Sequence, residues 1–463
     1  MDLEEKISLL AGAAKYDASC ASSGSGENRG GALFRGGGNS RRSGSSRTGA
    51  GTGVGAGAGA NRFGASLPAG VCHSWTGDGR CVSLLKVLFS NACRFDCAYC
   101  VNRVSADTRR TSFTVDELVE LTCQFYRRNY IEGLFLSSGI FSDPDIVMEK
   151  LIETARKLRT GAGFRGYIHL KIIPGAGEKS IREAGLWADR LSANIELPTD
   201  KSLQTLAPQK SGKLIFGAME QVSEIGAQLA EDRRRIRSAP DFAPAGQSTQ
   251  LIVGASAEDD RQIIALSGAL YRKYSLRRVY YSAFIPVGRP GQGGIPDPRL
   301  PDIPETPLGP GQSAAPRRLL TREHRLYQAD WLLRFYHFSP GEILDETSPY
   351  LDTHIDPKTA WAIKHPEWFP LAIETAGYEE LLRIPGVGAT SARRILEQRR
   401  SRSLSFDSLR RLGVVLKRAR YFITLGGAFL DPDSGKTAND PKRIRRLLSD
   451  IDGAGLQPPL FDF

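Results

Sequence analysis

Three closely spaced cysteines constrain this chain more than any other feature. Cys93, Cys97 and Cys100 stand in the segment NACRFDCAYC, separated by three and two residues. Thiolates this close together can bind three corners of an iron–sulfur cube while the chain wraps round it. Three ligands leave the fourth iron without a protein ligand, and an open metal position is where a substrate or cosubstrate binds. Tyr99, just before the last cysteine, offers a flat aromatic face beside such a cluster.

Other interpretations of the cysteines stay open at this point. Zinc would compete, but structural zinc takes four ligands, usually as two pairs, and no second cysteine pair follows at a typical spacing. Cys72 and His73 could be recruited only from an irregular position. The clustered cysteines could also be ordinary core residues, as we expect for Cys123. Cys20, Cys72 and Cys81 could form a second metal site, although small buried or loop cysteines are commoner.

Short apolar runs alternate with amphipathic segments over the first two thirds of the chain. The runs are bounded by Gly or Pro and rich in β-branched and aromatic residues; they cover 83–91, 133–139, 166–175, 190–199, 249–255 and 277–287. Such runs are typical of buried parallel strands. Between the first two, Thr114 and Glu117 form a capping-box pair that predicts a helix start. The pattern predicts an α/β fold with a parallel sheet, open or barrel-like.

Polar residues follow several of these predicted strands. The cysteine segment follows the first run, Ser137, Ser138 and Gly139 close the second, and Asn194 and Glu196 lie late in the fourth. Because the carboxyl ends of parallel strands meet at one rim, we expect these residues to converge there.

Composition divides the chain further. A Gly/Ser-rich stretch cannot bury enough apolar surface to fold by itself, and a Pro/Gly-rich stretch is typical of an extended loop. We expect an N-terminal segment of the core at 1–22, a disordered insertion at 23–66 and the core itself at 67–287. The Pro/Gly-rich loop follows at 288–320, a connecting helix at 321–340 and a C-terminal domain at 341–430. The remaining residues, 431–463, form a polar tail that we expect to add little.

The overall charge and the termini bound the partners. With 62 Lys and Arg against 51 Asp and Glu, the net charge is +11, which favours nucleic acid as a partner, although a basic protein without one is an equal alternative. The sequence has no long apolar stretch and no leader-like start, so we expect neither a membrane span nor a signal peptide. Few cysteines in a chain this long favour a reducing cytoplasm.

Residues 378–396 (YEELLRIPGVGATSARRIL) predict two helices joined by a tight turn. This segment resembles the helix-hairpin-helix motif of repair glycosylases, ligases and nucleases. The turn consists of Pro385, Gly386, Val387 and Gly388, and the basic residues Arg393 and Arg394 follow on the second helix. The glycines would bring backbone N–H groups to a phosphate where a helix begins. Residues 409–420 look like a second, degenerate copy; a basic helix pair that docks another protein is the alternative.

The cysteine segment CRFDCAYC resembles the signature of the radical S-adenosylmethionine (SAM) superfamily. The resemblance implies a partial (β/α)6 barrel in which the fourth iron of a [4Fe–4S] cluster chelates SAM, and reduction of the cluster yields a 5′-deoxyadenosyl radical. It also implies that Cys93, Cys97 and Cys100 are the metal ligands. The residues that it implies for SAM binding are Tyr99, Ser137, Ser138, Gly139, Asn194 and Glu196. The Ser-Ser-Gly stretch departs from the usual motif because it lacks the acid.

The wider pattern of KYDASC, CHSWTGDGRC, CRFDCAYCVNR, YIEGLFLSSG and the C-terminal hairpin is similar to a family described as DNA modification or repair radical SAM proteins. This resemblance implies a partial barrel plus a small all-α DNA-binding domain, and a reaction on DNA fed by an electron donor such as flavodoxin or ferredoxin. The alternatives are a radical SAM enzyme acting on RNA or tRNA, and a non-catalytic iron–sulfur protein that binds DNA and senses redox state. No catalytic residue can be named from the sequence.

Overall fold

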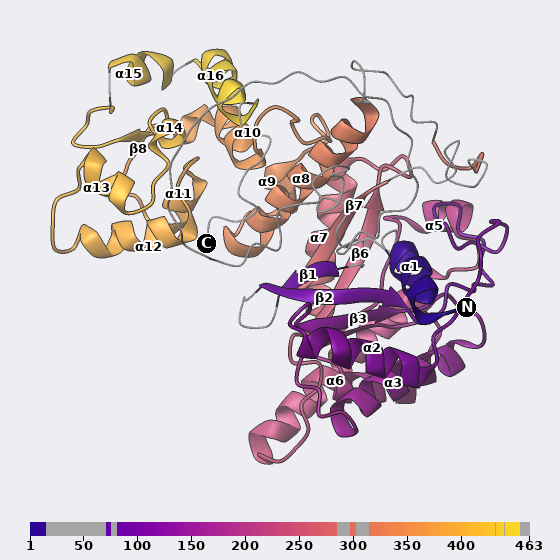
Figure 1. The fold of residues 1–463 in the computed structure, drawn as a ribbon. Helices are drawn as coiled ribbons and strands as arrows, with labels where there is room; N and C mark the ends of the chain where they lie inside the picture. The colour runs from indigo at the N-terminus through magenta and orange to yellow at the C-terminus, as the bar shows by residue number, and fades with distance from the viewer. Residues whose placement is uncertain are drawn as a thin grey trace, which may run out of the picture.

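The computed structural model shows a curled half-barrel followed by a smaller, mostly helical module (Figure 1). It describes residues 1–14, 71–75, 81–284, 297–301, 314–430, 432–438 and 440–453. The sheet has seven strands in sequential order, of which β2 to β7 run parallel and β1 pairs antiparallel with β2. The strands are β1 (Val71–Trp75), β2 (Cys81–Leu88), β3 (Gly133–Ser137), β4 (Tyr167–Lys171), β5 (Arg190–Ser192), β6 (Gln247–Val253) and β7 (Arg278–Ala283).

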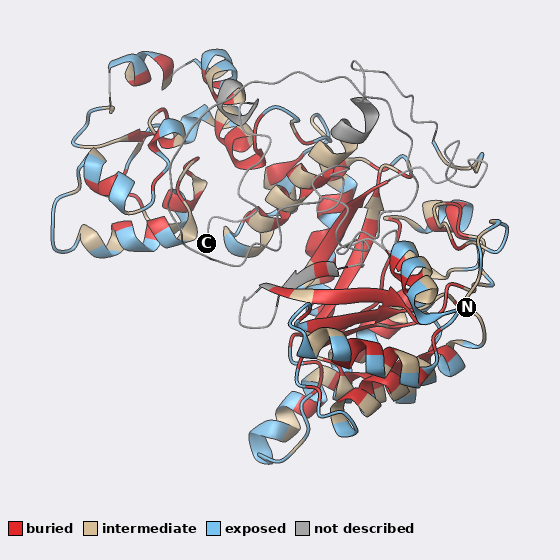
Figure 2. Ribbon diagram, viewed as in Figure 1, coloured by how far each residue is buried: buried red, intermediate tan, exposed pale blue. Residues whose placement is uncertain are grey.

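The parallel strands form where the apolar runs predict them, because both faces of each strand are covered. Every residue of β3 is buried, as is every residue of β5, and the strands form the buried centre of the domain in Figure 2. Continuous burial explains why these segments read as unbroken apolar runs rather than as alternating ones. The predicted α/β class and partial barrel are therefore confirmed.

Helices connect the strands and cover the outer face of the sheet. They are α2 (Val115–Arg127), α3 (Pro144–Thr160), α4 (Glu178–Trp187), α5 (Asp200–Leu206), α6 (Gly212–Arg235) and α7 (Asp260–Tyr274), and an N-terminal helix, α1 (Leu3–Ala14), packs against β2. The predicted capping box at the start of α2 is confirmed. Thr114 Oγ1 accepts a hydrogen bond from Glu117 N at 3.2 Å, and the Glu117 carboxylate accepts one from Thr114 N at 2.7 Å. None of the helices in the described part of the chain could cross a membrane.

Two strand boundaries differ from the expectation. The hairpin partner β1 carries no apolar run and was not predicted. The fourth predicted strand, 190–199, is wrong in extent, because regular pairing ends at Ser192. The Thr249 side chain takes the place of the backbone ladder there: its hydroxyl donates to Ala193 O at 2.7 Å and accepts from Ile195 N at 3.1 Å.

The open edge of the half-barrel is closed by helix α8 (Ala314–Phe335), which packs along β7. Side chains of α8 satisfy the free backbone groups of this edge strand. The Tyr327 hydroxyl donates to Tyr281 O at 2.9 Å and accepts from Tyr281 N at 3.1 Å, and Glu323 accepts from Ala283 N at 2.6 Å. An exposed strand edge would otherwise be free to pair with another chain. Helix α8 begins at Ala314, seven residues before the expected connecting helix 321–340, because the Pro- and Ala-rich start of the segment folds as helix.

The C-terminal module follows α8. Its helices are α9 (Pro340–Ile343), α10 (Pro357–Lys364), the short 3-10 helix Pro366–Trp368, α11 (Tyr378–Arg383), α12 (Ala389–Gln398), α13 (Phe406–Arg411), α14 (Leu416–Ala419), α15 (Pro432–Ala438) and α16 (Pro441–Gly453). The expected all-α domain also contains one short parallel pairing, β8 (Leu371–Ala372) with β9 (Ile423–Thr424). The expectation of a tail that adds little is wrong: Ile444 and Leu448 of α16 are buried, and α16 packs on α10.

Candidate active site at the carboxyl rim

The cysteine loop begins where β2 ends, at the carboxyl rim of the sheet. Cys97 is buried, and Cys93 and Cys100 are half-buried. Two backbone N–H groups of the loop point at sulfur: Phe95 N lies 3.5 Å from Cys93 Sγ, and Asn102 N lies 3.4 Å from Cys100 Sγ. Hydrogen bonds of this kind stabilise a thiolate and tune an iron–sulfur cluster.

Arg110 ties the two ends of the cysteine loop together. Its guanidinium donates to four carbonyl oxygens, at 2.8 Å to Asn91, 2.9 Å to Asn102, 2.7 Å to Arg103 and 3.1 Å to Ala106. Asn91 precedes the cysteines and the other three follow them. The planar fork of arginine suits several fixed acceptors at once, so this one side chain fixes the loop on both sides of the cysteines.

The Ser-Ser-Gly stretch at the end of β3 supports the same loop. Ser137 is buried, while Ser138 and Gly139 are half-buried. Gly139 N donates to Ser90 O at 2.7 Å, and a Cβ on Gly139 would lie 2.3 Å from Ala92 O. The backbone of the predicted SAM-binding stretch therefore packs directly against the chain that leads into Cys93.

Glu196 lies beside the cysteine loop in a charged cluster with Lys171 and Lys210. Its φ is +63°, and its backbone bridges to β6 at Leu251. A left-handed backbone conformation is uncommon at residues other than glycine, and the residues that adopt it are often found at functional sites. Glu196 Oε1 lies 3.0 Å from Lys210 Nζ and 3.4 Å from Lys171 Nζ. Two cations and one carboxylate leave a net positive charge at the rim, which suits an anionic ligand.

Tyr99 joins the cysteine loop to this charged cluster. Lys210 Nζ lies 5.8 Å from the centre of the Tyr99 ring, and the Tyr99 hydroxyl is buried with Lys210 and Cys97 close to it. Asn194 is also buried, next to Glu196 in the chain. The structure thus brings Tyr99, Glu196 and the cysteines together, as the sequence predicts, and adds two lysines.

The electrostatics of the rim favour neutral thiols until a metal binds. Burial and the nearby Cys97 thiol raise the pKa of Cys100 to about 12. Burial also raises the pKa of Cys97, although Lys210 opposes the change. Burial lowers the pKa of Lys210, but Glu196, Tyr99 and Cys97 together outweigh it, and that pKa lies well above its usual value. Because metal ligation requires the thiolate, loading this loop must release protons.

The remaining cysteines lie elsewhere or outside the described residues. Cys72 is buried in a small apolar cluster with Val82 and Phe135, and Cys123 packs in the main core. Cys81 stands at the start of β2, and Cys20 falls outside the described residues. Among the residues that the structure describes, no group of three or more His, Cys, Asp or Glu side chains could hold a single metal ion. The thiolates of a [4Fe–4S] cluster bind separate irons, so they do not have to meet at one point.

The predicted hairpin folds as two stacked helix pairs. The first is α11 with α12 and the second is α13 with α14. Gly386 has φ +83° and Gly413 has φ +92°, so each turn uses a left-handed glycine. The turns contact each other: Val415 N donates to Gly386 O at 2.9 Å, and a Cβ on Gly386 would lie 2.6 Å from Val415 O. Gly386 therefore makes the close approach between the two hairpins possible.

The other predicted residues of this hairpin divide between core and surface. Pro385 and Val387 are buried, Gly388 is half-buried at the start of α12, and Arg393 and Arg394 are exposed. The buried pair holds the turn, so only the arginines present side chains to a partner.

Three residues of the rim were missed from the sequence: Lys171, Lys210 and Arg110. Lys171 had a signal, because it closes the buried run YIHLK at the carboxyl end of β4. Lys210 had none, since it lies in a polar segment between α5 and α6 and reaches the cysteines only through the fold.

Comparison with known proteins agrees with the geometry of the rim. The radical SAM superfamily profile matches residues 87–228, from the end of β2 into α6. Residues 87–228 therefore match the radical SAM domain, the kind of domain found in enzymes that use a [4Fe–4S] cluster and SAM. No curated protein matches the sequence.

Solved structures match over about half of the chain. HydG, a maturase of the [FeFe]-hydrogenase, is 12% identical and covers 52% of this chain and 48% of its own, with a TM-score of 0.36. HydG from Carboxydothermus hydrogenoformans is 14% identical, and the match covers 53% of this chain and 50% of that HydG, with a TM-score of 0.38. Methylornithine synthase (PylB) is 14% identical, and the match covers 52% of this chain and 61% of PylB, with a TM-score of 0.36. The chain therefore spans about half to three fifths of the length of these structures.

Proposed function

We propose that this protein is a radical SAM enzyme that repairs or modifies DNA, and that its C-terminal hairpins hold the duplex. The cluster ligands in this proposal are Cys93, Cys97 and Cys100. Cluster and SAM together supply a carbon-centred radical that can take a hydrogen atom from a substrate. The residues of this chain hold both cofactors, orient them and exclude water.

The donor set of the rim suits these cofactors. Three thiols on a braced loop provide three cluster ligands and leave one iron open. Lys171 and Lys210 provide the positive charge that a carboxylate such as that of SAM would need, and Glu196 sets their positions. Ser137, Ser138, Gly139 and Asn194 would line the same cofactor site.

One observation carries the nucleic-acid part of the proposal: the two hairpins expose basic side chains that form no ion pair with a carboxylate of the described residues. The exposed side chains are Arg393, Arg394, Arg400, Arg402, Arg410, Arg411 and Lys417. Within the described part of the chain, none of them forms an ion pair. Surface cations of this kind usually pair with nearby acids or solvate separately, whereas a cluster without partners is typical of a phosphate-binding surface.

The second hairpin supplies part of this surface, which supports duplex rather than single-stranded substrates. The contact between Gly386 and Val415 holds the two hairpins at a fixed distance, so that they can contact two positions along a phosphate backbone at once. Contacts of this kind hold a duplex without reading its sequence. Helix α8 joins this module to the barrel edge, so bound DNA would lie beside a rigid catalytic domain.

The test is cofactor turnover in the presence of different nucleic acids. Protein reconstituted without oxygen is given dithionite and SAM, and 5′-deoxyadenosine is measured by chromatography with lesion-bearing duplex DNA, with intact duplex, with tRNA or with no nucleic acid. We expect duplex DNA to stimulate release and the R393Q/R394Q variant to lose the stimulation while keeping the basal rate. Stimulation by tRNA alone would replace DNA with RNA as the substrate. No release under any condition would favour a non-catalytic redox sensor.

A further inference from the structure

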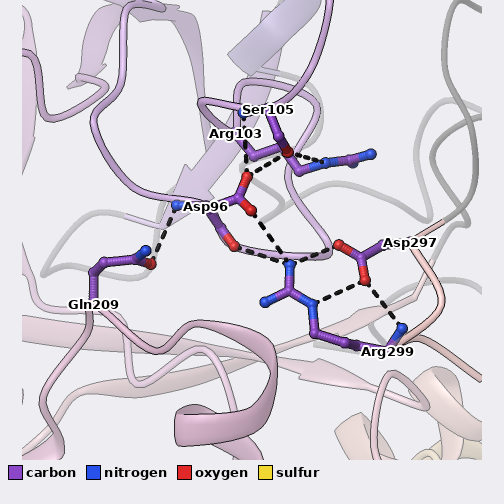
Figure 3. Close-up of polar contacts among 6 residues, drawn as sticks. All are labelled: Asp96, Arg103, Ser105, Gln209, Asp297 and Arg299. Atoms are coloured by element: carbon purple, nitrogen blue, oxygen red, sulfur yellow. Dashed lines mark hydrogen bonds and ion pairs between the residues drawn. The ribbon is translucent and has the colours of Figure 1, made fainter.

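A short segment far along the sequence contacts the cysteine loop. Residues 297–301 lie against Asp96, which stands directly before Cys97 (Figure 3). The contact is made by Arg299, which comes from beyond the last barrel strand. The cysteine loop is thus held not only by neighbouring barrel segments but also by a part of the chain 203 residues away.

Arg299 is oriented by its own neighbour before it reaches the loop. Its Nε and Nη2 donate to the two carboxylate oxygens of Asp297 at 2.9 and 2.6 Å, and its backbone N donates to the same carboxylate at 3.0 Å. The Asp297 side chain is only 9% exposed. A paired fork of this kind fixes the guanidinium plane and leaves less rotamer freedom to lose when further contacts form.

The guanidinium then reaches Asp96 in two ways. Nη2 donates to the backbone carbonyl of Asp96 at 3.2 Å and lies 3.6 Å from its carboxylate. The other polar groups of Asp96 are also held: its carboxylate accepts from Ser105 N at 3.2 Å and Ser105 Oγ at 2.5 Å, and its N donates to Gln209 at 3.2 Å. Asp96 is therefore fixed by three separate segments, between the first and second cysteines.

Charge adds to this geometry. The hydrogen bonds that Arg299 donates to Asp297 raise the pKa of its guanidinium, and Asp96 and Cys97 also favour its charged form. Asp96 and Asp297 both interact with this cation, and the Arg103 charge also acts on Asp297. Without Arg299 they would leave negative charge beside the cysteine loop, where like charges repel at short range.

We infer that Arg299 is a positioning residue for the cysteine loop and that its charge raises the reduction potential of the cluster held there. The inference rests on the proposed function, in which the clustered cysteines hold the cluster. Reduction adds negative charge to the cluster, so a fixed cation nearby favours the reduced state. Side chains around a metal site set its potential through charge and hydrogen bonds in this way.

The experiment is a redox titration of the cluster followed by electron paramagnetic resonance, on full-length protein loaded without oxygen. We expect R299M to lower the ratio of reduced to oxidised cluster at a fixed applied potential about tenfold, which is about 59 mV for one electron. R299K should keep the wild-type potential but lose iron to a chelator faster, because it keeps the charge and loses the fork. D297N should move the potential in the opposite direction, because it removes a negative charge.

The control is R159M. Arg159, in the last turn of α3, also donates to backbone carbonyls, of Phe164 and Gly166, and pairs with Asp189. These contacts lie at the amino end of β4, away from the cysteine loop. R159M should lower stability without changing the potential. Equal potentials in wild type and R299M, or shifts of the same sign in R299M and D297N, would refute the tuning role. Wild-type protein that forms no iron–sulfur cluster would instead refute the proposed function.

Discussion

Replacing Gly139 with alanine tests how tightly the end of β3 holds the cysteine loop. A Cβ at this position would lie 2.3 Å from Ala92 O, 3.0 Å from Ala92 C and 3.1 Å from Ser90 O. All three are backbone atoms, so no side chain can rotate away to make room. Overpacking a filled site costs about 1–3 kcal/mol, and here the strain can be relieved only by moving the loop that leads into Cys93.

The expected result is a loss of cluster that exceeds the loss of fold. Iron and sulfide per folded chain are measured after anaerobic reconstitution, and stability is measured by denaturant unfolding followed by circular dichroism. G139A should bind substantially less iron per folded chain and release the remainder to a chelator faster, because the cysteine loop no longer fits its support. Its unfolding free energy should fall by about 1–3 kcal/mol.

Two other glycines provide matched controls. A Cβ on Gly133 would lie 2.2 Å from Tyr167 O, but at the opposite end of β3. G133A should therefore lose stability while keeping its iron per folded chain. A Cβ on Gly217 in helix α6 would meet nothing within 4 Å, so G217A should gain up to about 1 kcal/mol from helix propensity. Wild-type iron loading in G139A, or an iron loss in G133A as large as that in G139A, would show that the end of β3 does not support the cysteine loop.

Three further predictions concern the charged cluster and the C-terminal module. K210M should weaken SAM binding by the cluster-loaded protein about 10-fold or more, because a charge-assisted hydrogen bond is lost. The control K201M changes an exposed position on α5 and should leave SAM binding unchanged. Equilibrium dialysis measures the SAM affinity of both variants. Burial lowers the pKa of Lys358 to about 7 in the folded protein. Between pH 7 and the normal lysine pKa, the unfolded chain therefore binds one proton more than the folded chain. The free energy of unfolding should rise with pH over this range, by up to about 1.4 kcal/mol per pH unit. K358M should remove that slope in urea unfolding between pH 6 and 9. G386A, whose Cβ would lie 2.6 Å from Val415 O at a φ of +83°, should separate the hairpins and weaken duplex binding in fluorescence anisotropy while leaving the iron content unchanged.

The sequence predicted the barrel well because burial on both faces leaves a local trace. A strand covered on both sides must be apolar throughout, so the run 133–139 identifies β3 without reference to its partners. The fourth run predicted too long a strand because the interruption after Ser192 comes from the hydroxyl of Thr249, on the next strand of the sheet. No pattern within 190–199 could show a contact made by a side chain more than 50 residues away.

The tail was misjudged for a related reason. Helix α16 is strongly charged, and apolar residues such as Ile444, Leu447 and Leu448 stand among arginines and aspartates. Ile444 and Leu448 lie four residues apart on one face and are buried. That spacing marks a helix face only when a partner exists to cover it, and the partner, α10, lies far back in the sequence. The spacing of an amphipathic helix is thus present in the sequence, but only the fold shows which element covers its apolar face.

The active-site rim shows the same limit in sharper form. Metal ligation leaves a trace in the sequence because three thiols must reach one cluster, and a single loop does this with short spacing. The groups that hold this loop have no such constraint: a guanidinium needs only to reach a carbonyl oxygen, and the chain can deliver it from any direction. Arg110 is close in sequence, whereas Arg299 comes from beyond β7, yet each donates to backbone oxygens of the same loop. Ligands can be predicted from spacing, but the residues that fix those ligands can be found only from the folded chain.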